Sequence, residues 1–159
     1  MAIHKLHIDD FDEIDYQLIA IHTSLEDYRL AYILNQKLPV LLQKSKEEIQ
    51  VRIKEGTTSF SRYLFENPER EIYWNLIQNR NEVLSNSETT ADLFAGAGMA
   101  VATQVYLLPE FKKVDYFLKI ENSEMPVEKI TEQIQTAPQI STVYSVDTAK
   151  IKSKNNLIF

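Results

Sequence analysis

Apolar residues in this chain recur mostly at every second position, which is the period of a half-buried β-strand. The clearest case is Ile49, Val51 and Ile53, which alternate with charged and amide side chains. A largely apolar run at 16–21 predicts a buried strand. The same patterns predict further strands at residues 40–42, 60–65, 72–76, 101–108, 114–121 and 140–146. We therefore expect β-structure to dominate the fold.

Two segments instead carry apolar residues at helical spacing. The first predicts one buried helix face, made of Leu25, Tyr28, Ala31, Tyr32, Leu34 and Leu38. Pro39 closes this helix, because proline disfavours helical geometry in the residue before it. The second helix carries Val127, Ile130 and Ile134 and begins at Pro126, where a missing N–H costs nothing.

The order of these elements predicts an α+β fold, with a mainly antiparallel sheet and two principal helices on one face. Residues 16–24 and 116–123 share a pattern, and each segment leads into a helix, a proline and another strand. Two such β-α-β halves favour a ferredoxin-like plan with the intervening strands as an inserted hairpin. A chance likeness within a small α+β protein is the alternative.

The length of 159 residues fits a single domain, spanning residues 1–159. A polar stretch with few apolar anchors predicts a flexible loop at about 79–98. Gly96 and Gly98 let the chain bend at the end of this loop. The loop interrupts the domain without dividing it, because too little chain follows to fold well alone.

Composition and charge narrow the possible functions. The chain has no cysteine, which excludes disulfides, iron–sulfur clusters and thiolate zinc sites. Its net charge of −6 repels phosphate groups, so neither nucleic acid nor a membrane surface is an expected partner. The basic stretch 150–154 fits a solvated tail. Without a signal-peptide pattern or a membrane-spanning apolar run, we expect a cytoplasmic protein.

The string 92–99 resembles the glycine motif of Rossmann-type methyltransferases, which bind S-adenosylmethionine. That motif needs a buried strand before its glycines and a helix after them. Here residues 87–91 are polar and the residues after Gly98 alternate at strand period. A loop is favoured, and a methyltransferase is kept as an alternative.

Two other groups of residues have side chains suited to chemistry. His4 and His7 lie near an acidic run and could bind a metal, but on a strand they point to opposite faces, which favours a solvated turn. Glu110 and Asp115 bracket a turn and could act as acid and base. Without a third polar partner they fit turn residues better. We therefore predict no catalytic residue, no metal site and no cofactor.

Residues 108–116, Leu-Pro-Glu-Phe-Lys-Lys-Val-Asp-Tyr, resemble the signature of the IPExxxVDY family, an uncharacterised group of small proteins from Bacteroidota. Leu108 replaces the isoleucine of the signature. Segments 24–31, 73–77 and 156–159 are also similar to the family. The resemblance implies no activity, because the family has none assigned. It singles out motif positions of unknown role, namely Pro109, Glu110, Val114, Asp115 and Tyr116.

The chain ends on three apolar residues, Leu157, Ile158 and Phe159, after a polar stretch. Such an end is expected to dock on its own core or to interact with a partner as an added strand. With eight tyrosines, one tryptophan and no catalytic constellation, we predict a non-enzymatic protein-interaction or adaptor module, able to form a homodimer. The alternative is a small-ligand-binding regulatory domain, which the two β-α-β halves favour.

Overall fold

The computed structural model describes residues 15–54, 56–86 and 100–159. The strands in these ranges are β1 (Tyr16–Thr23), β2 (Gln43–Lys44), β3 (Ile49–Ile53), β4 (Gly56–Phe60), β5 (Arg62–Asn67), β6 (Ile72–Gln78), β7 (Arg80–Asn86), β8 (Ala100–Tyr106), β9 (Tyr116–Glu121) and β10 (Ile140–Ser145). The helices are α1 (Asp27–Lys37) and α2 (Val127–Gln135), with short 3-10 turns η2 (Pro68–Arg70), η3 (Pro109–Phe111), η4 (Thr148–Lys150) and η5 (Lys154–Leu157). The predicted α+β class is confirmed.

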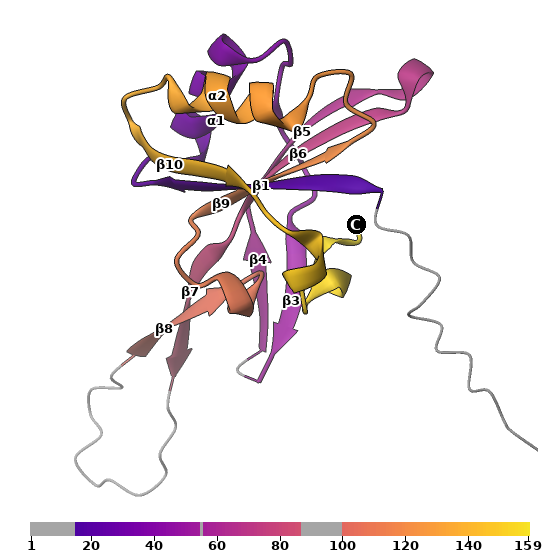
Figure 1. Cartoon of the computed structure of the whole chain (residues 1–159). Helices are drawn as coiled ribbons and strands as arrows, with labels where there is room; N and C mark the ends of the chain where they lie inside the picture. The colour runs from indigo at the N-terminus through magenta and orange to yellow at the C-terminus, as the bar shows by residue number, and fades with distance from the viewer. Residues whose placement is uncertain (1–14, 55, 87–99) are drawn as a thin grey trace, which may run out of the picture.

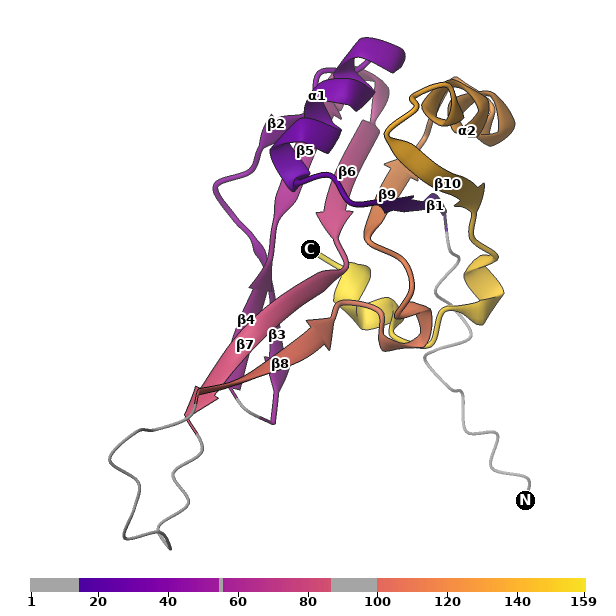
Figure 2. The ribbon, with the colours of Figure 1, turned by 90° about the vertical axis from the view of Figure 1, so that its left-hand side faces the viewer.

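Six strands form the main sheet in the order β10-β1-β9-β6-β5-β2, and each neighbouring pair is antiparallel. Helix α1 lies between β1 and β6 in the chain, and α2 lies between β9 and β10. The four strands β10-β1-β9-β6 therefore have the 4-1-3-2 order of two interlocked β-α-β halves, which is the ferredoxin-like plan. Two hairpins, β3–β4 and β7–β8, are inserted and project together beyond the sheet (Figures 1 and 2).

The sheet buries side chains on both faces, which explains the largely apolar run in β1. Ile19 and Ile21 face α1 and α2, whereas Leu18 and Ala20 face the opposite side. Figure 1 shows both helices above the sheet and the C-terminal segment below it. On this lower side, Leu157 belongs to a second core with residues of β1, β9 and the turn before β9.

The buried face of α1 differs from the predicted one. Leu30, Ala31 and Leu34 are buried, while Tyr28 and Tyr32 are 53% and 65% exposed. The sequence carries two overlapping stripes, and the aliphatic stripe packs on the sheet while the tyrosine hydroxyls stay in water. Within the described ranges, no helix combines the length and apolarity that crossing a bilayer requires.

Three strand predictions and the loop prediction also need correction. Residues 40–42 form no strand, and the predicted strand at 60–65 divides at Ser61 into β4 and β5. The alternation at 101–108, apolar on both faces, is typical of a central strand, but β8 pairs only with β7 among the described strands. The loop predicted at 79–98 is wrong at its start, because residues 80–86 form β7; residues 87–99 lie outside the described ranges. Backbone pairing with β8 holds this polar strand, so no apolar alternation is needed.

Candidate functional site

The motif at 108–116 follows the β7–β8 hairpin and leads into β9. Pro109 opens the 3-10 turn η3, and Leu108 and Val114 are buried in the lower core. The turn is fixed by Asn79, which is fully buried. Its Nδ2 donates to the carbonyl oxygens of Phe111 (2.9 Å) and Val114 (2.8 Å), and its Oδ1 accepts from the Leu108 N–H (2.9 Å). Sequence reasoning placed Asn79 in a loop, and no periodicity signals its role.

Glu110 joins the motif to the C-terminal segment. Its Oε1 accepts from the N–H groups of Lys152 and Ser153, both at 2.8 Å, and its Oε2 accepts from the Ser153 hydroxyl at 3.0 Å. Burial alone would raise the pKa of Glu110, but these hydrogen bonds outweigh it and the pKa lies below its ordinary value. Glu110 thus anchors a chain segment in its charged form.

Asp115 and Tyr116 hold the connection between β1 and α1. Asp115 Oδ2 accepts from the Thr23 N–H (3.0 Å), and Oδ1 pairs with Arg80 at the base of β7. The Tyr116 hydroxyl donates to the Leu25 carbonyl oxygen (2.7 Å), and burial, together with nearby acidic groups, raises its pKa to about 12. Because Glu110 and Asp115 hold different segments, the structure gives them no shared acid–base geometry.

A polar hollow of about 490 Å³ lies beside the end of the motif. It is lined by Thr23, Ser24, Leu25, Gln78, Arg80, Asn81, Glu82, Gln104, Asp115 and Tyr116. Asp115 and Arg80 pair with each other there. The motif side chains in this hollow are therefore engaged within the chain, which makes them supports of the fold rather than free ligand contacts.

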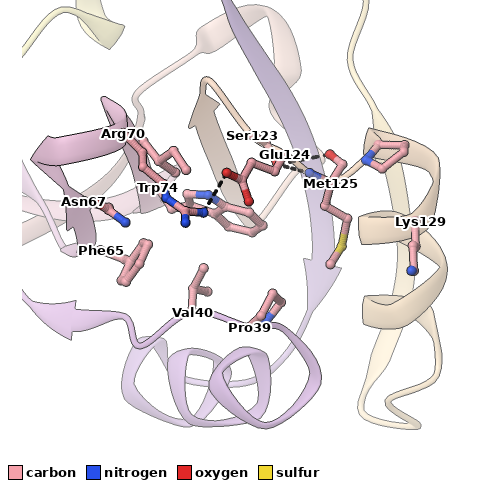
Figure 3. Close-up of a pocket in the computed structure, with 12 residues that line it drawn as sticks. Pro39, Val40, Phe65, Asn67, Arg70, Trp74, Ser123, Glu124, Met125 and Lys129 are labelled. Atoms are coloured by element: carbon pink, nitrogen blue, oxygen red, sulfur yellow. Dashed lines mark hydrogen bonds and ion pairs between the residues drawn. The ribbon is translucent and has the colours of Figure 1, made fainter.

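A second hollow, of about 380 Å³, has mainly apolar walls and lies on the helix side of the sheet (Figure 3). We call it the Trp74 hollow. Its apolar walls are Pro39, Val40, Phe65, Ile72, Trp74, Met125 and Pro126, and its polar lining residues are Asn67, Arg70, Ser123, Glu124 and Lys129. The sequence placed none of them in a binding site: Pro39 and Pro126 were predicted as helix boundaries, and Val40, Phe65, Ile72 and Trp74 fell within predicted strands.

Three separate parts of the chain build the Trp74 hollow. Trp74 of β6 and Phe65 of β5 are direct cross-strand partners and form one wall. Pro39 follows the end of α1 and turns the chain across the opposite side. The third part is the turn before α2, where the Ser123 hydroxyl bonds to both the N–H (3.1 Å) and the carbonyl oxygen (3.0 Å) of Met125.

The rim of the Trp74 hollow carries charges of both signs. Arg70 Nη1 lies 2.7 Å from Glu124 Oε1, and both side chains are largely exposed. Next to this ion pair, Glu71 and Asn122 adopt left-handed backbone geometry, with φ of 54° and 55°. Asn122 Nδ2 donates to the Glu71 carbonyl oxygen at 2.9 Å, which ties the two rim segments together. Non-glycine residues with left-handed backbone angles occur preferentially in turns and at functional sites.

No protein-family model, curated protein or solved structure matches this chain. Membership of the IPExxxVDY family therefore stays a prediction. The fold and the side-chain geometry alone carry the functional argument.

One further polar cluster has the residue types of a serine–lysine catalytic pair. Lys44 Nζ donates to Ser61 Oγ at 2.6 Å, and Ser61 donates to Asp27. Ser61 is buried, and Asp27 begins α1. Burial alone would raise the pKa of Asp27, but its bonds to Ser61 and Tyr28 and the charge of Lys44 lower it. The cluster is a bridged ion pair that ties α1 to β2 and to the link between β4 and β5.

The C-terminal residues predicted to interact, Leu157, Ile158 and Phe159, have different surroundings. Leu157 is buried, its carbonyl oxygen accepts from Lys119 Nζ (3.0 Å), and Ile158 is 73% exposed. The Phe159 ring lies against the cations of Arg62 and Lys119, with centroid distances of 4.5 and 4.8 Å.

His4, His7 and the 92–99 string lie outside the described residues, and β8, not a helix, starts at residue 100. Across the described ranges, no three histidine or acidic side chains gather as a metal site.

Proposed function

We propose that this chain is a non-catalytic domain that binds a small amphipathic molecule in the Trp74 hollow. The observation that carries the proposal is the aromatic wall of Trp74 and Phe65 beneath a charged rim. Small-molecule sites are typically concave, about 300–1,000 Å³ in volume, mostly apolar and fitted with a few polar groups. The Trp74 hollow meets each of these criteria.

The position of the hollow supports a regulatory use. Its β6 wall belongs to the first β-α-β half and its Ser123–Pro126 turn to the second. A ligand bound there contacts both halves, so its binding energy adds to their association. Binding is therefore expected to stabilise the whole sheet and not one segment.

The test uses the fact that Trp74 is the single tryptophan of the chain. Its fluorescence reports the hollow directly, and small aromatic acids, amines and amino acids serve as the first set of ligands. We expect a saturable fluorescence change and a matching rise in melting temperature with at least one of them. Val40→Phe fills the hollow and abolishes both effects.

Leu41→Phe is the matched control, because it introduces the same phenylalanine side chain one residue later, at a position that is 60% exposed outside this hollow. It should bind like the unaltered protein. If no ligand in the set changes Trp74 fluorescence, or if both variants lose binding equally, the proposed function is wrong.

A protein-interaction function is the second candidate, and strand β10 favours it. β10 lies at one edge of the main sheet, and its sequence, Ile-Ser-Thr-Val-Tyr-Ser, contains no charge and no proline. Natural edge strands usually carry charged residues or proline, which prevent pairing with another chain. Antiparallel pairing of two β10 strands would give a symmetric homodimer with no like charges opposed.

Thr142→Lys tests this second candidate by placing two like charges near the centre of the paired strands. A dimer in sedimentation equilibrium should become a monomer, while Thr136→Lys, at the exposed end of α2, should leave it unchanged. A monomeric unaltered protein would remove homodimerisation as a function. The cytoplasmic location stays a prediction.

A further inference from the structure

We infer that the molecule bound in the Trp74 hollow is an α-amino acid with a large apolar side chain, held as a zwitterion. This inference rests on the proposed function and adds the chemical class of the ligand. The zwitterion follows from three features of the hollow: the signs of the rim charges, the exposure of the rim ion pair, and the bond that ties the two rim segments together. The apolar side chain follows from the walls below the rim.

The first feature is that positive and negative groups lie on the same rim. Arg70 and Lys129 are cationic and Glu124 is anionic, and all three line the hollow. A ligand with only a carboxylate would meet Glu124, and a ligand with only an amine would meet Arg70 and Lys129. A ligand with both groups satisfies both signs, and this is how a binding site excludes molecules that carry one of them.

The second feature is that the rim ion pair can be opened at little cost. Arg70 and Glu124 are 63% and 68% exposed, and exposed ion pairs contribute little to stability. A ligand carboxylate can take the Arg70 guanidinium, which suits two parallel hydrogen bonds to a carboxylate. The ligand ammonium then replaces Arg70 beside Glu124. Each rim charge exchanges one partner for another.

The third feature is the fixed geometry of the rim. Arg70 precedes Glu71, and Glu124 lies two residues after Asn122; these two left-handed residues are joined by the 2.9 Å bond between Asn122 Nδ2 and the Glu71 carbonyl oxygen. The segments that carry the opposite charges are therefore held together before any ligand arrives. Pre-organisation of this kind lowers the entropic cost of binding.

The apolar walls specify the side chain of the ligand. Directly below the charged rim, Trp74 is 3% exposed and pairs across the sheet with Phe65. Met125 closes the side toward α2 (Figure 3). An aromatic or long aliphatic side chain would cover the partly exposed Phe65 and Met125 at the mouth above Trp74. A polar side chain would lose its hydration there without gaining a partner.

The experiment compares phenylalanine with 3-phenylpropionate, phenethylamine and N-acetylphenylalanine amide by Trp74 fluorescence and calorimetry at pH 7. The four molecules share the phenyl group and differ in their charges. We expect phenylalanine to bind at least about tenfold more tightly than each of the others, because each of them lacks one or both charged contacts. Glu124→Gln should weaken phenylalanine about tenfold and leave 3-phenylpropionate no weaker.

Arg29→Gln is the control, since Arg29 forms an exposed ion pair with Glu26 on α1, and it should bind phenylalanine like the unaltered protein. If all four molecules bind equally, the zwitterion is wrong while the ligand-binding function stands. If the N-acetyl amide binds most tightly, the ligand is not a free amino acid, and a phenylalanine side chain within a peptide is the better description. If neither these molecules nor the wider set binds, both the inference and the proposed function fall.

Discussion

Glu110 accepts hydrogen bonds from both the backbone N–H and the hydroxyl of Ser153, at 2.8 and 3.0 Å, across 43 positions of the chain. Glu110→Ala removes these bonds and leaves two N–H groups of the C-terminal segment without their acceptor. We expect a loss of about 1–2 kcal/mol in the free energy of unfolding, since the site is partly exposed. Urea denaturation measures it, and Glu132→Ala, on the exposed side of α2, should cost less than about 0.5 kcal/mol.

The contribution of Glu110 should depend on pH in a defined direction. Its pKa is lower in the folded than in the unfolded chain, so the folded state prefers the charged carboxylate. The stability it adds is present above its ordinary pKa of 4.5 and is lost as the pH falls through the folded value. The difference in unfolding free energy between the unaltered protein and Glu110→Gln should shrink on acidification from pH 6. A difference that grows in acid would contradict the assigned hydrogen bonds.

Asn79 is expected to be among the most sensitive positions of the fold. Its side chain serves three backbone groups of the motif turn while fully buried. Asn79→Ala leaves buried donors and acceptors unpaired and should cost about 3 kcal/mol or more in unfolding free energy. Asn155→Ala, at an exposed asparagine of η5, should cost less than about 0.5 kcal/mol. Equal effects of the two changes would show that the Asn79 contacts contribute nothing.

Tyr116 provides a test at alkaline pH. Its pKa is raised to about 12 from 10.0, so the folded state prefers the neutral hydroxyl that bonds to Leu25. The stabilisation is complete below pH 10 and is lost as the pH rises toward 12. Tyr116→Phe should cost about 1 kcal/mol at pH 8 and remove this alkaline loss. Unfolding curves at pH 8 and above pH 10 measure both effects, and exposed Tyr32→Phe should change neither.

The C-terminal residues offer a matched pair of neighbours. Leu157 is 1% exposed in the lower core, whereas Ile158 is 73% exposed. Leu157→Ala should cost about 2–4 kcal/mol in unfolding free energy, because it leaves a cavity in a packed core. Ile158→Ala should cost less than about 0.5 kcal/mol. If Ile158→Ala lowered the free energy of unfolding more than Leu157→Ala, the assignment of Leu157 as the buried side chain would be wrong.

Much of the sheet could be predicted from local patterns. The alternation at Ile49, Val51 and Ile53 reports one buried face, and it corresponds to β3. The shared order around residues 16–24 and 116–123 also led to the correct ferredoxin-like connectivity, because β1 and β9 start equivalent β-α-β halves. These features depend on residues close together in the chain, so short stretches of sequence are enough to predict them.

The candidate site could not be predicted in the same way. The Trp74 hollow needs Pro39, Trp74 and Glu124 from three parts of the chain, and no local spacing relates them. Asn79 was missed because a polar side chain saturated by backbone groups looks like a loop residue in sequence. The face of α1 was misjudged because tyrosine fits either a core or a water-exposed position.

The place of β1 in the sheet has a consequence for how the molecule assembles. β1 is the earliest described strand, yet it lies between β9 and β10, and His22 of β1 bonds to Tyr144 of β10, 122 positions later. The central ladder therefore closes very long loops, whereas the hairpins β3–β4 and β7–β8 close short ones. Chains dominated by such distant pairings fold slowly, on the order of milliseconds to seconds. Until β9 and β10 arrive, the unpaired backbone edges and the apolar side chains of β1 stay open to solvent and to other chains. The period before the ladder forms is therefore when aggregation is most expected.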